Sequence, residues 1–103
     1  MTSPNILENV TFDSDGFLED YLDWTPDIAE GIAAEEGIVL TDRHYIVINY
    51  ARKIFAETGD APTMRGITKN TDVSTKELYA LFPKGPAKKA ARIAGLKKPT
   101  GCI

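Results

Sequence analysis

The longest regular pattern of the 103-residue chain is TDRHYIVINYARKIFAETG, residues 41–59. Thr41 is a typical N-cap, and Gly59 is a typical left-handed residue after the last turn of a helix. Between them, apolar side chains recur every three or four residues, which predicts a helix over 42–58 with one broad buried stripe. The stripe comprises Ile46, Val47, Tyr50, Ala51, Ile54 and Phe55. We expect this helix to lie at the centre of a small helical bundle.

Shorter patterns on both sides of this helix predict further helices. One begins after the N-cap Thr25, with Pro26 as its first residue, and ends at Gly37. A short helix over 64–69, a turn, and a helix from 75 to 82 together have helix-turn-helix-like spacing. The last helix begins at Pro86, is rich in Ala, Lys and Arg, and ends at Gly95. The chain is therefore predicted to be mainly α.

The two ends of the chain have different patterns. Short apolar stretches flank the turn formers of residues 13–15, which predicts a small N-terminal β-hairpin and a minor α+β character. Residues 96–103 contain a Pro and a Gly and have neither helical nor strand periodicity. We expect one globular domain over 1–95, followed by a flexible C-terminal arm over 96–103.

Charge is distributed unevenly, although the net charge is only −3. Residues 1–60 carry three cations and thirteen acids, whereas residues 61–103 carry nine cations and two acids. Such a basic end is typical either of a solvated face or of a surface that attracts anions, nucleic acid or an acidic partner. Composition does not choose between these.

Several classes of protein are excluded or disfavoured. A single Cys cannot form an internal disulfide, which excludes a disulfide-stapled secreted domain. No apolar run approaches the roughly 18–20 residues that span a bilayer, and the first residues lack the features of a secretory signal. One Cys and one His cannot complete a zinc shell, so neither a metal nor a cofactor is expected. We expect a cytoplasmic protein.

Cys102 is the candidate reactive residue. Lys97 and Lys98 lie just before it and Arg92 lies on the preceding helix, and nearby cations favour the thiolate over the thiol. An accessible thiolate attacks sulfane sulfur or accepts it as a persulfide. An eight-residue arm reaches at most about 26–29 Å, enough to enter the active site of a partner. Lys84 and Lys88 extend the basic region that would dock such a partner. An incidental thiol stays the alternative.

Two further interpretations are open. The helix-turn-helix-like spacing suggests DNA binding, with Lys76, Glu77 and Tyr79 as a weak reading set and the basic last helix suited to phosphates. His44 begins the central helix, where a histidine is usually structural; a Cys–His pair with Cys102 has no support in the sequence.

The C-terminal sequence carries a family resemblance. LFPKGPAK (81–88), IAGL (93–96) and KPTGCI (98–103), together with DSDGFL (13–18) and Asp23-Trp24, resemble the TusE/DsrC family of sulfur carriers. The resemblance covers nearly the whole chain and implies a small helical bundle with a mobile arm, with Cys102 as its functional residue. DsrC itself carries a second cysteine eleven positions earlier, where this chain has Ala91.

The resemblance implies a sulfur-relay function. Cys102 would accept sulfane sulfur from a TusBCD- or DsrEFH-like donor complex. It would pass the sulfur to an acceptor protein, either a tRNA thiolase that makes 2-thiouridine or a sulfite reductase. The chain would then be a sulfurtransferase only in the broad sense of a protein-to-protein carrier, with no active-site pocket of its own. A non-transferring, DsrC-like docking module of a sulfur enzyme is the remaining alternative.

Overall fold

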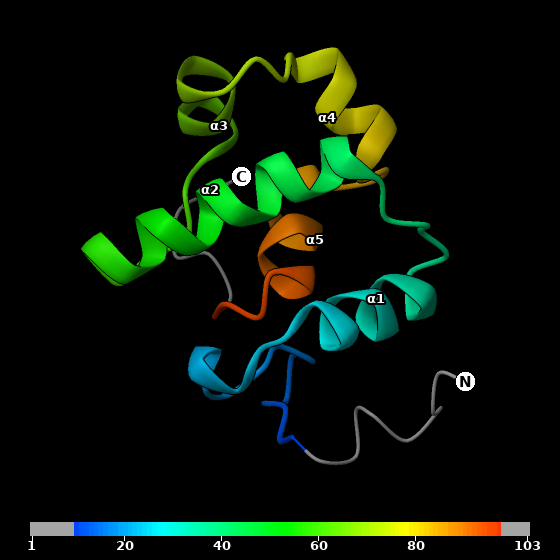
Figure 1. Cartoon of the computed structure of the whole chain (residues 1–103), viewed down its shortest axis with the longest axis vertical. Coiled ribbons are helices and arrows are strands. Elements are labelled where there is room, and N and C mark those ends of the chain that lie inside the picture. Colours follow the sequence, from blue (N-terminus) through cyan, green and yellow to red (C-terminus); the bar gives the residue numbers. More distant parts are fainter. Residues whose placement is uncertain (1–9, 98–103) are drawn as a thin grey trace.

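The computed structural model of the chain describes residues 10–97. In chain order its elements are η2 (Tyr21–Asp23), α1 (Pro26–Glu35), α2 (Asp42–Thr58), α3 (Met64–Asn70), α4 (Thr75–Leu81) and α5 (Pro86–Ile93). Helix α5 packs against both α1 and α2. Helices α3 and α4 lie at the end of the molecule opposite α1 (Figure 1). The basic last helix is therefore the central element of the packing.

The predicted helices are confirmed. Their ends could be predicted because they are determined by local capping. The Thr25 hydroxyl accepts a hydrogen bond from the backbone N–H of Ile28, and Ser74 caps α4 in the same way through Glu77. Gly59 ends α2 with a φ of 82°, the left-handed conformation that glycine adopts without steric penalty. Each of these contacts spans three or four residues, so each is encoded in a short stretch of sequence.

The buried face of α2 is rotated from the predicted stripe. Val47, Ile48 and Ala51 are fully buried, whereas Ile46 is 36% exposed. Helix α2 packs against α5 and α3, and of the other stripe residues Phe55 is buried while Tyr50 and Ile54 are only partly buried. Periodicity identified the helix, but the positions of its neighbours determined which part of it is buried.

The predicted N-terminal β-hairpin is wrong. Within residues 10–97 no strand forms, and the only pairing is an isolated antiparallel bridge between Phe12 and Leu18. Asp13 closes the intervening turn by accepting hydrogen bonds from the backbone N–H groups of Asp15 and Phe17. Phe17 and Leu18 are buried against the helices, and the chain then enters η2. Packing of Phe17 and Leu18 on the helices thus takes the place of the strand pairing that a hairpin would have continued.

Only the first two residues of the expected C-terminal arm, Leu96 and Lys97, lie within the described part of the chain. Leu96 is fully buried, and its backbone N–H donates a 2.9 Å hydrogen bond to the carbonyl of Ala91. The body therefore includes Leu96. Lys97 has an exposed side chain, and residues 98–103, with Lys98 and Cys102, lie outside the described residues, so the flexible arm stays a prediction.

Candidate functional site

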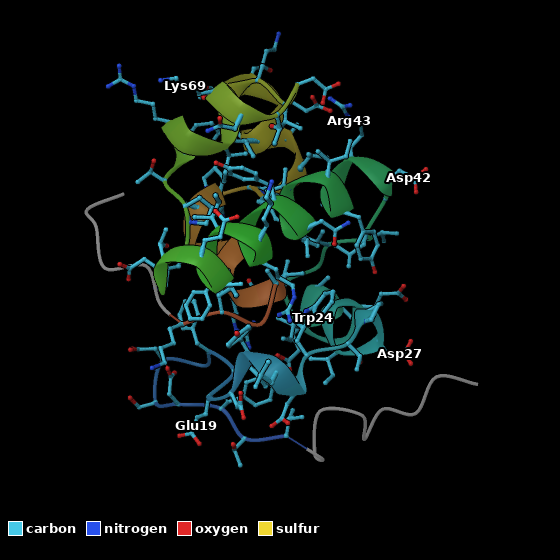
Figure 2. The ribbon with its side chains drawn as sticks, turned by 60° about the vertical axis from the view of Figure 1, so that its left-hand side comes forward. Glu19, Trp24, Asp27, Asp42, Arg43 and Lys69 are labelled. Atoms are coloured by element: carbon cyan, nitrogen blue, oxygen red, sulfur yellow. The ribbon has the colours of Figure 1, made fainter. Side chains whose placement is uncertain are left out.

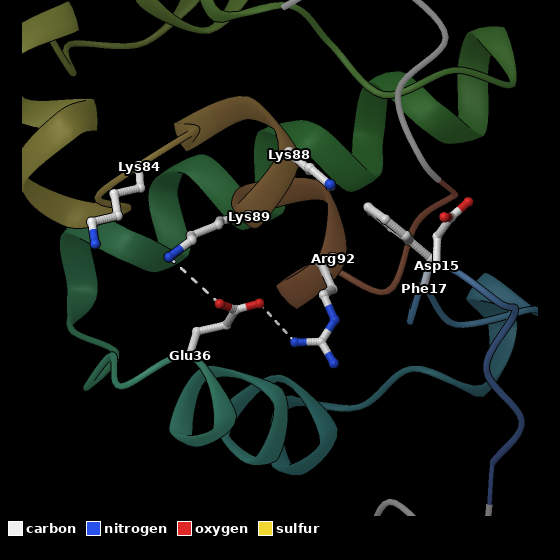
Figure 3. Close-up of a pocket in the computed structure, with 7 residues that line it drawn as sticks. All are labelled: Asp15, Phe17, Glu36, Lys84, Lys88, Lys89 and Arg92. Atoms are coloured by element: carbon white, nitrogen blue, oxygen red, sulfur yellow. Dashed lines mark hydrogen bonds and ion pairs between the residues drawn. The ribbon is translucent and has the colours of Figure 1, made fainter.

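A basic hollow lies beside α5. Its volume is about 310 Å³, and it is lined by Asp15, Phe17, Glu36, Lys84, Lys88, Lys89 and Arg92 (Figure 3). Three of the five predicted docking cations, Lys84, Lys88 and Arg92, thus meet at one place. Lys97 follows the opposite end of α5, and Lys98 lies outside the described residues.

Arg92 is bound to the body of the protein. Its guanidinium lies 2.8 Å from a carboxylate oxygen of Glu35 and 2.8 Å from one of Glu36, and its Nε donates to the carbonyl of Gly16. These contacts connect α5 to α1 and to the turn at residues 13–17. Arg92 therefore organises the basic hollow, and its predicted effect on Cys102 stays a prediction.

Lys84 and Lys88, the two exposed lysines of the hollow, differ from Arg92 in their contacts. Lys89 pairs with Glu36 at 3.5 Å, but neither Lys84 nor Lys88 forms an ion pair within residues 10–97. Lys84 and Gly85 both have left-handed backbone conformations, with φ of 62° and 95°, and this double turn directs the chain into Pro86 at the start of α5. Lys84 and Lys88 are therefore the exposed cations of this surface, which also carries the exposed Asp15.

Two residues to which the sequence analysis gave no part in the site hold the other end of α5. Trp24 donates a 2.8 Å hydrogen bond from its indole Nε1 to the carbonyl of Ile93. Arg52 of α2 donates from Nη1 to the carbonyl of Ala94, also at 2.8 Å. The partners are 69 and 42 residues apart in sequence, so no local pattern indicates them. The chain runs from this anchored end towards Cys102.

Ala91 is 1% exposed and belongs to the core. Its methyl group stands eleven positions before Cys102, where the resemblance places the second thiol of DsrC. A methyl group has no redox chemistry, so this position offers Cys102 no partner for a disulfide.

His44 is structural. Its side chain is buried, its Nδ1 accepts a hydrogen bond from the backbone N–H of Thr41, and its Nε2 lies 2.9 Å from the carbonyl of Leu81. Because a carbonyl only accepts, Nε2 carries the proton and donates. Both ring nitrogens are occupied, so neither is available as a catalytic base.

The helix-turn-helix-like pair is confirmed as α3 and α4, but its second helix has few groups available to read DNA. Arg43 of α2 binds the Glu77 carboxylate through two 2.7 Å hydrogen bonds and the Asp72 carboxylate through one of 3.0 Å. The hydrogen bonds from Arg43 lower the pKa of the Glu77 carboxyl. Of the weak reading set, Lys76 and Tyr79 remain exposed.

The described part of the chain has neither a metal-binding cluster nor a membrane-spanning helix. Among residues 10–97, no three His, Cys, Asp or Glu side chains are grouped so that they could hold a metal ion. Over the same residues, no helix is both long and apolar enough to cross a membrane.

The fold and the anchored end of α5 define a class of small helical proteins in which a basic terminal helix leads into a cysteine-bearing C-terminal segment. Comparison with known proteins agrees. The chain belongs to the DsrC family: the family model described as "DsrC like protein" matches residues 7–103.

Relatives of known name share most of the chain. The gamma subunit of the dissimilatory-type sulfite reductase of Nitratidesulfovibrio vulgaris is 42% identical over 92 residues, which is 88% of each chain. Sulfurtransferase TusE of Buchnera aphidicola is 38% identical over 105 residues, covering 95% of this chain and 92% of its own. The NMR structure of Allochromatium vinosum DsrC is 40% identical with a TM-score of 0.80, covering 91% of this chain and 90% of that one.

Proposed function

We propose that the chain is a sulfur-relay carrier that accepts sulfane sulfur on Cys102 as a persulfide and delivers it to another protein. The observation that carries the proposal is the only cysteine of the sequence, Cys102, which lies within the residues 7–103 that match the DsrC family model. The names of the relatives, a sulfurtransferase and a sulfite reductase subunit, support sulfur as the cargo.

The proposed step balances without an added oxidant or reductant. The Cys102 thiolate attacks the terminal sulfur of a donor persulfide, and a bond forms between these two sulfur atoms. The bond between the donor Sγ and the terminal sulfur breaks, and the donor leaves as a thiolate. Delivery repeats the same exchange with Cys102 as the leaving thiolate. A reducing cytoplasm, the compartment that we propose, keeps the thiol available between cycles.

Ala91 makes this a single-thiol cycle. A second cysteine at this position would let Cys102 close an intramolecular disulfide or trisulfide, as the resemblance to DsrC implies. A buried methyl group allows only transfer to a different molecule. Single-thiol transfer favours a TusE-like relay towards a tRNA thiolase over a redox cycle with a sulfite reductase.

Docking is assigned to the cations of the C-terminal region. Lys84 and Lys88 are exposed beside the hollow, and Lys97 and Lys98 follow α5. Clustered cations attract acidic surfaces and raise association rates at low salt. The proposed partners are a TusBCD- or DsrEFH-type donor complex and an acceptor protein.

Mass spectrometry tests the proposal directly. After incubation with a persulfide-loaded donor complex, the wild-type chain gains the mass of one sulfur atom on Cys102, and Cys102→Ser gains none. Equal loading of the serine variant would remove the carrier function. Binding to the donor without loading of the wild-type chain would indicate a non-transferring docking module, and tight, salt-sensitive binding to duplex DNA that ignores Cys102→Ser would indicate the DNA-binding alternative.

A further inference from the structure

We propose that Trp24 and Arg52 are positioning residues that determine the direction in which the segment bearing Cys102 leaves the body. This inference rests on the proposed carrier function and adds to it the structural basis for presenting the thiol.

The C-terminal end of α5 has every carbonyl of its last turn bound. The Gly95 N–H donates to the carbonyl of Arg92 and the Leu96 N–H donates to that of Ala91, which together form a Schellman motif. The next two carbonyls, those of Ile93 and Ala94, accept from the side chains of Trp24 and Arg52. Water can satisfy the carbonyls at a helix end, so hydrogen bonding alone does not require two side chains from distant elements at these positions.

Trp24 also holds the backbone by direct packing. Gly95 has a φ of 75°, and a Cβ atom added to it would lie 2.4 Å from Cδ1 of the indole. The indole therefore lies against the bare backbone at the position where the chain turns out of α5. This turn can neither accept a larger residue nor rotate without displacing Trp24.

Arg52 is in turn held on three sides. Its Cζ lies 4.3 Å from the ring centroid of Trp24 and 5.5 Å from that of Tyr21, and its Nη2 donates to the Tyr21 carbonyl at 3.1 Å. Partial burial lowers the pKa of Arg52, and its two carbonyl partners compensate for the lost hydration. Elements η2, α2 and α5 thus meet at a single guanidinium.

The anchored end lies on the same helix as the docking surface. Lys84 and Lys88 lie at the start of α5, and its eight residues extend about 12 Å to the other end. Cys102 follows Leu96 by six residues, so an extended chain places its Cα at most about 20–22 Å from that of Leu96. A partner docked on the lysines therefore meets the thiol only if the chain leaves α5 in the right direction, and misplacement by an ångström is enough to slow a reaction strongly.

Arg52→Lys is the test variant, because it keeps the charge but loses the planar fork that binds two carbonyls. Arg43→Lys is the matched control: the same substitution on the same helix, on an arginine whose partners are Asp72 and Glu77. Figure 2 shows Arg43 in a different part of the molecule from Trp24. We expect Arg52→Lys to lower the rate of sulfur transfer from a persulfide-loaded donor complex by about tenfold or more. Its Cys102 should react with cysteine persulfide at the wild-type rate. Arg43→Lys should stay within twofold of wild type in both assays.

A readout independent of sulfur chemistry distinguishes this inference from the proposed function. The chain has one Trp and one Cys, so energy transfer from Trp24 to a dye on Cys102 reports the direction of the segment. Arg52→Lys should change the distribution of transfer efficiencies, and Arg43→Lys should not. An unchanged distribution in Arg52→Lys, or unchanged protein-to-protein transfer despite a changed distribution, would overturn the inference. Absence of loading in the wild type would instead overturn the carrier function.

Discussion

Arg92 Nη1 and Glu36 Oε2 are 2.8 Å apart and join the last turn of α5 to the C-terminal end of α1. The Arg92 side chain is 20% exposed and that of Glu36 is 23% exposed, so the pair is substantially shielded from water. The basic region predicted to serve sulfur transfer is thus also part of the structural framework.

Arg92→Met should destabilise the fold by about 2–3 kcal/mol, because it removes three charge-assisted hydrogen bonds and leaves Glu36 with fewer partners. Lys88→Met on the exposed face of the same helix should change stability by no more than about 0.5 kcal/mol. Urea unfolding followed by circular dichroism measures both. Equal stability of the two variants would contradict the framework role of Arg92.

His44→Ala should destabilise the protein by about 2–4 kcal/mol. It leaves the Thr41 N–H and the Leu81 carbonyl without their side-chain partner and removes an edge-to-face contact with Phe82 at 5.1 Å. Asn49→Ala, on an exposed position of the same helix, is the control and should have little effect. Sulfur loading of Cys102 in folded His44→Ala should equal that of wild type. A large loss of Cys102 reactivity in the folded variant would instead support a catalytic Cys–His pair.

Gly95→Ala and Gly37→Ala form a matched pair, because both glycines have a φ of 75°. An alanine at position 37 meets no atom within 4 Å, so only the left-handed backbone opposes it, at roughly 1–2 kcal/mol. An alanine at position 95 also collides with Trp24, which adds about 1–3 kcal/mol. The difference between the two unfolding free energies measures the packing of Trp24 on the chain. Equal unfolding free energies for the two variants would show that Trp24 accommodates the added methyl group at little cost.

Glu77 should contribute to the pH dependence of stability. Its pKa in the folded protein is lowered by the hydrogen bonds from Arg43, so its stabilising effect is complete above the ordinary glutamate value of 4.5 and is lost as the pH falls through the lowered pKa. The difference in Tm between wild type and Glu77→Gln should therefore be constant near neutral pH and shrink below about pH 4.5. In an Arg43→Met background this pH-dependent difference should disappear; its persistence would assign the effect to another partner.

Ala91→Cys tests whether the position of the missing thiol determines the chemistry. With a second thiol, oxidation should link residues 91 and 102 within one chain, which mass spectrometry detects as the loss of two hydrogens. In a variant loaded with persulfide, the introduced thiol should attack Sγ of Cys102, break the persulfide S–S bond and release the outer sulfur as hydrogen sulfide, whereas wild type retains that sulfur. A chain that oxidises only to dimers would show that these two positions do not meet.

The sequence by itself determined the helices and their ends, because capping contacts such as those of Thr25 and Ser74 join residues three apart. It also determined the sulfur chemistry open to the chain, since the only cysteine is Cys102 and position 91 carries a methyl group. Tertiary structure decided what binds Arg92 and Arg52, which face of α2 is buried, and that Phe12 and Leu18 pair without forming strands. The partners of Arg92 and Arg52 lie dozens of positions away in sequence, and the Phe12–Leu18 turn is shaped by the burial of Phe17 and Leu18 in the body. Such contacts arise only when whole helices pack and compete for the same surface.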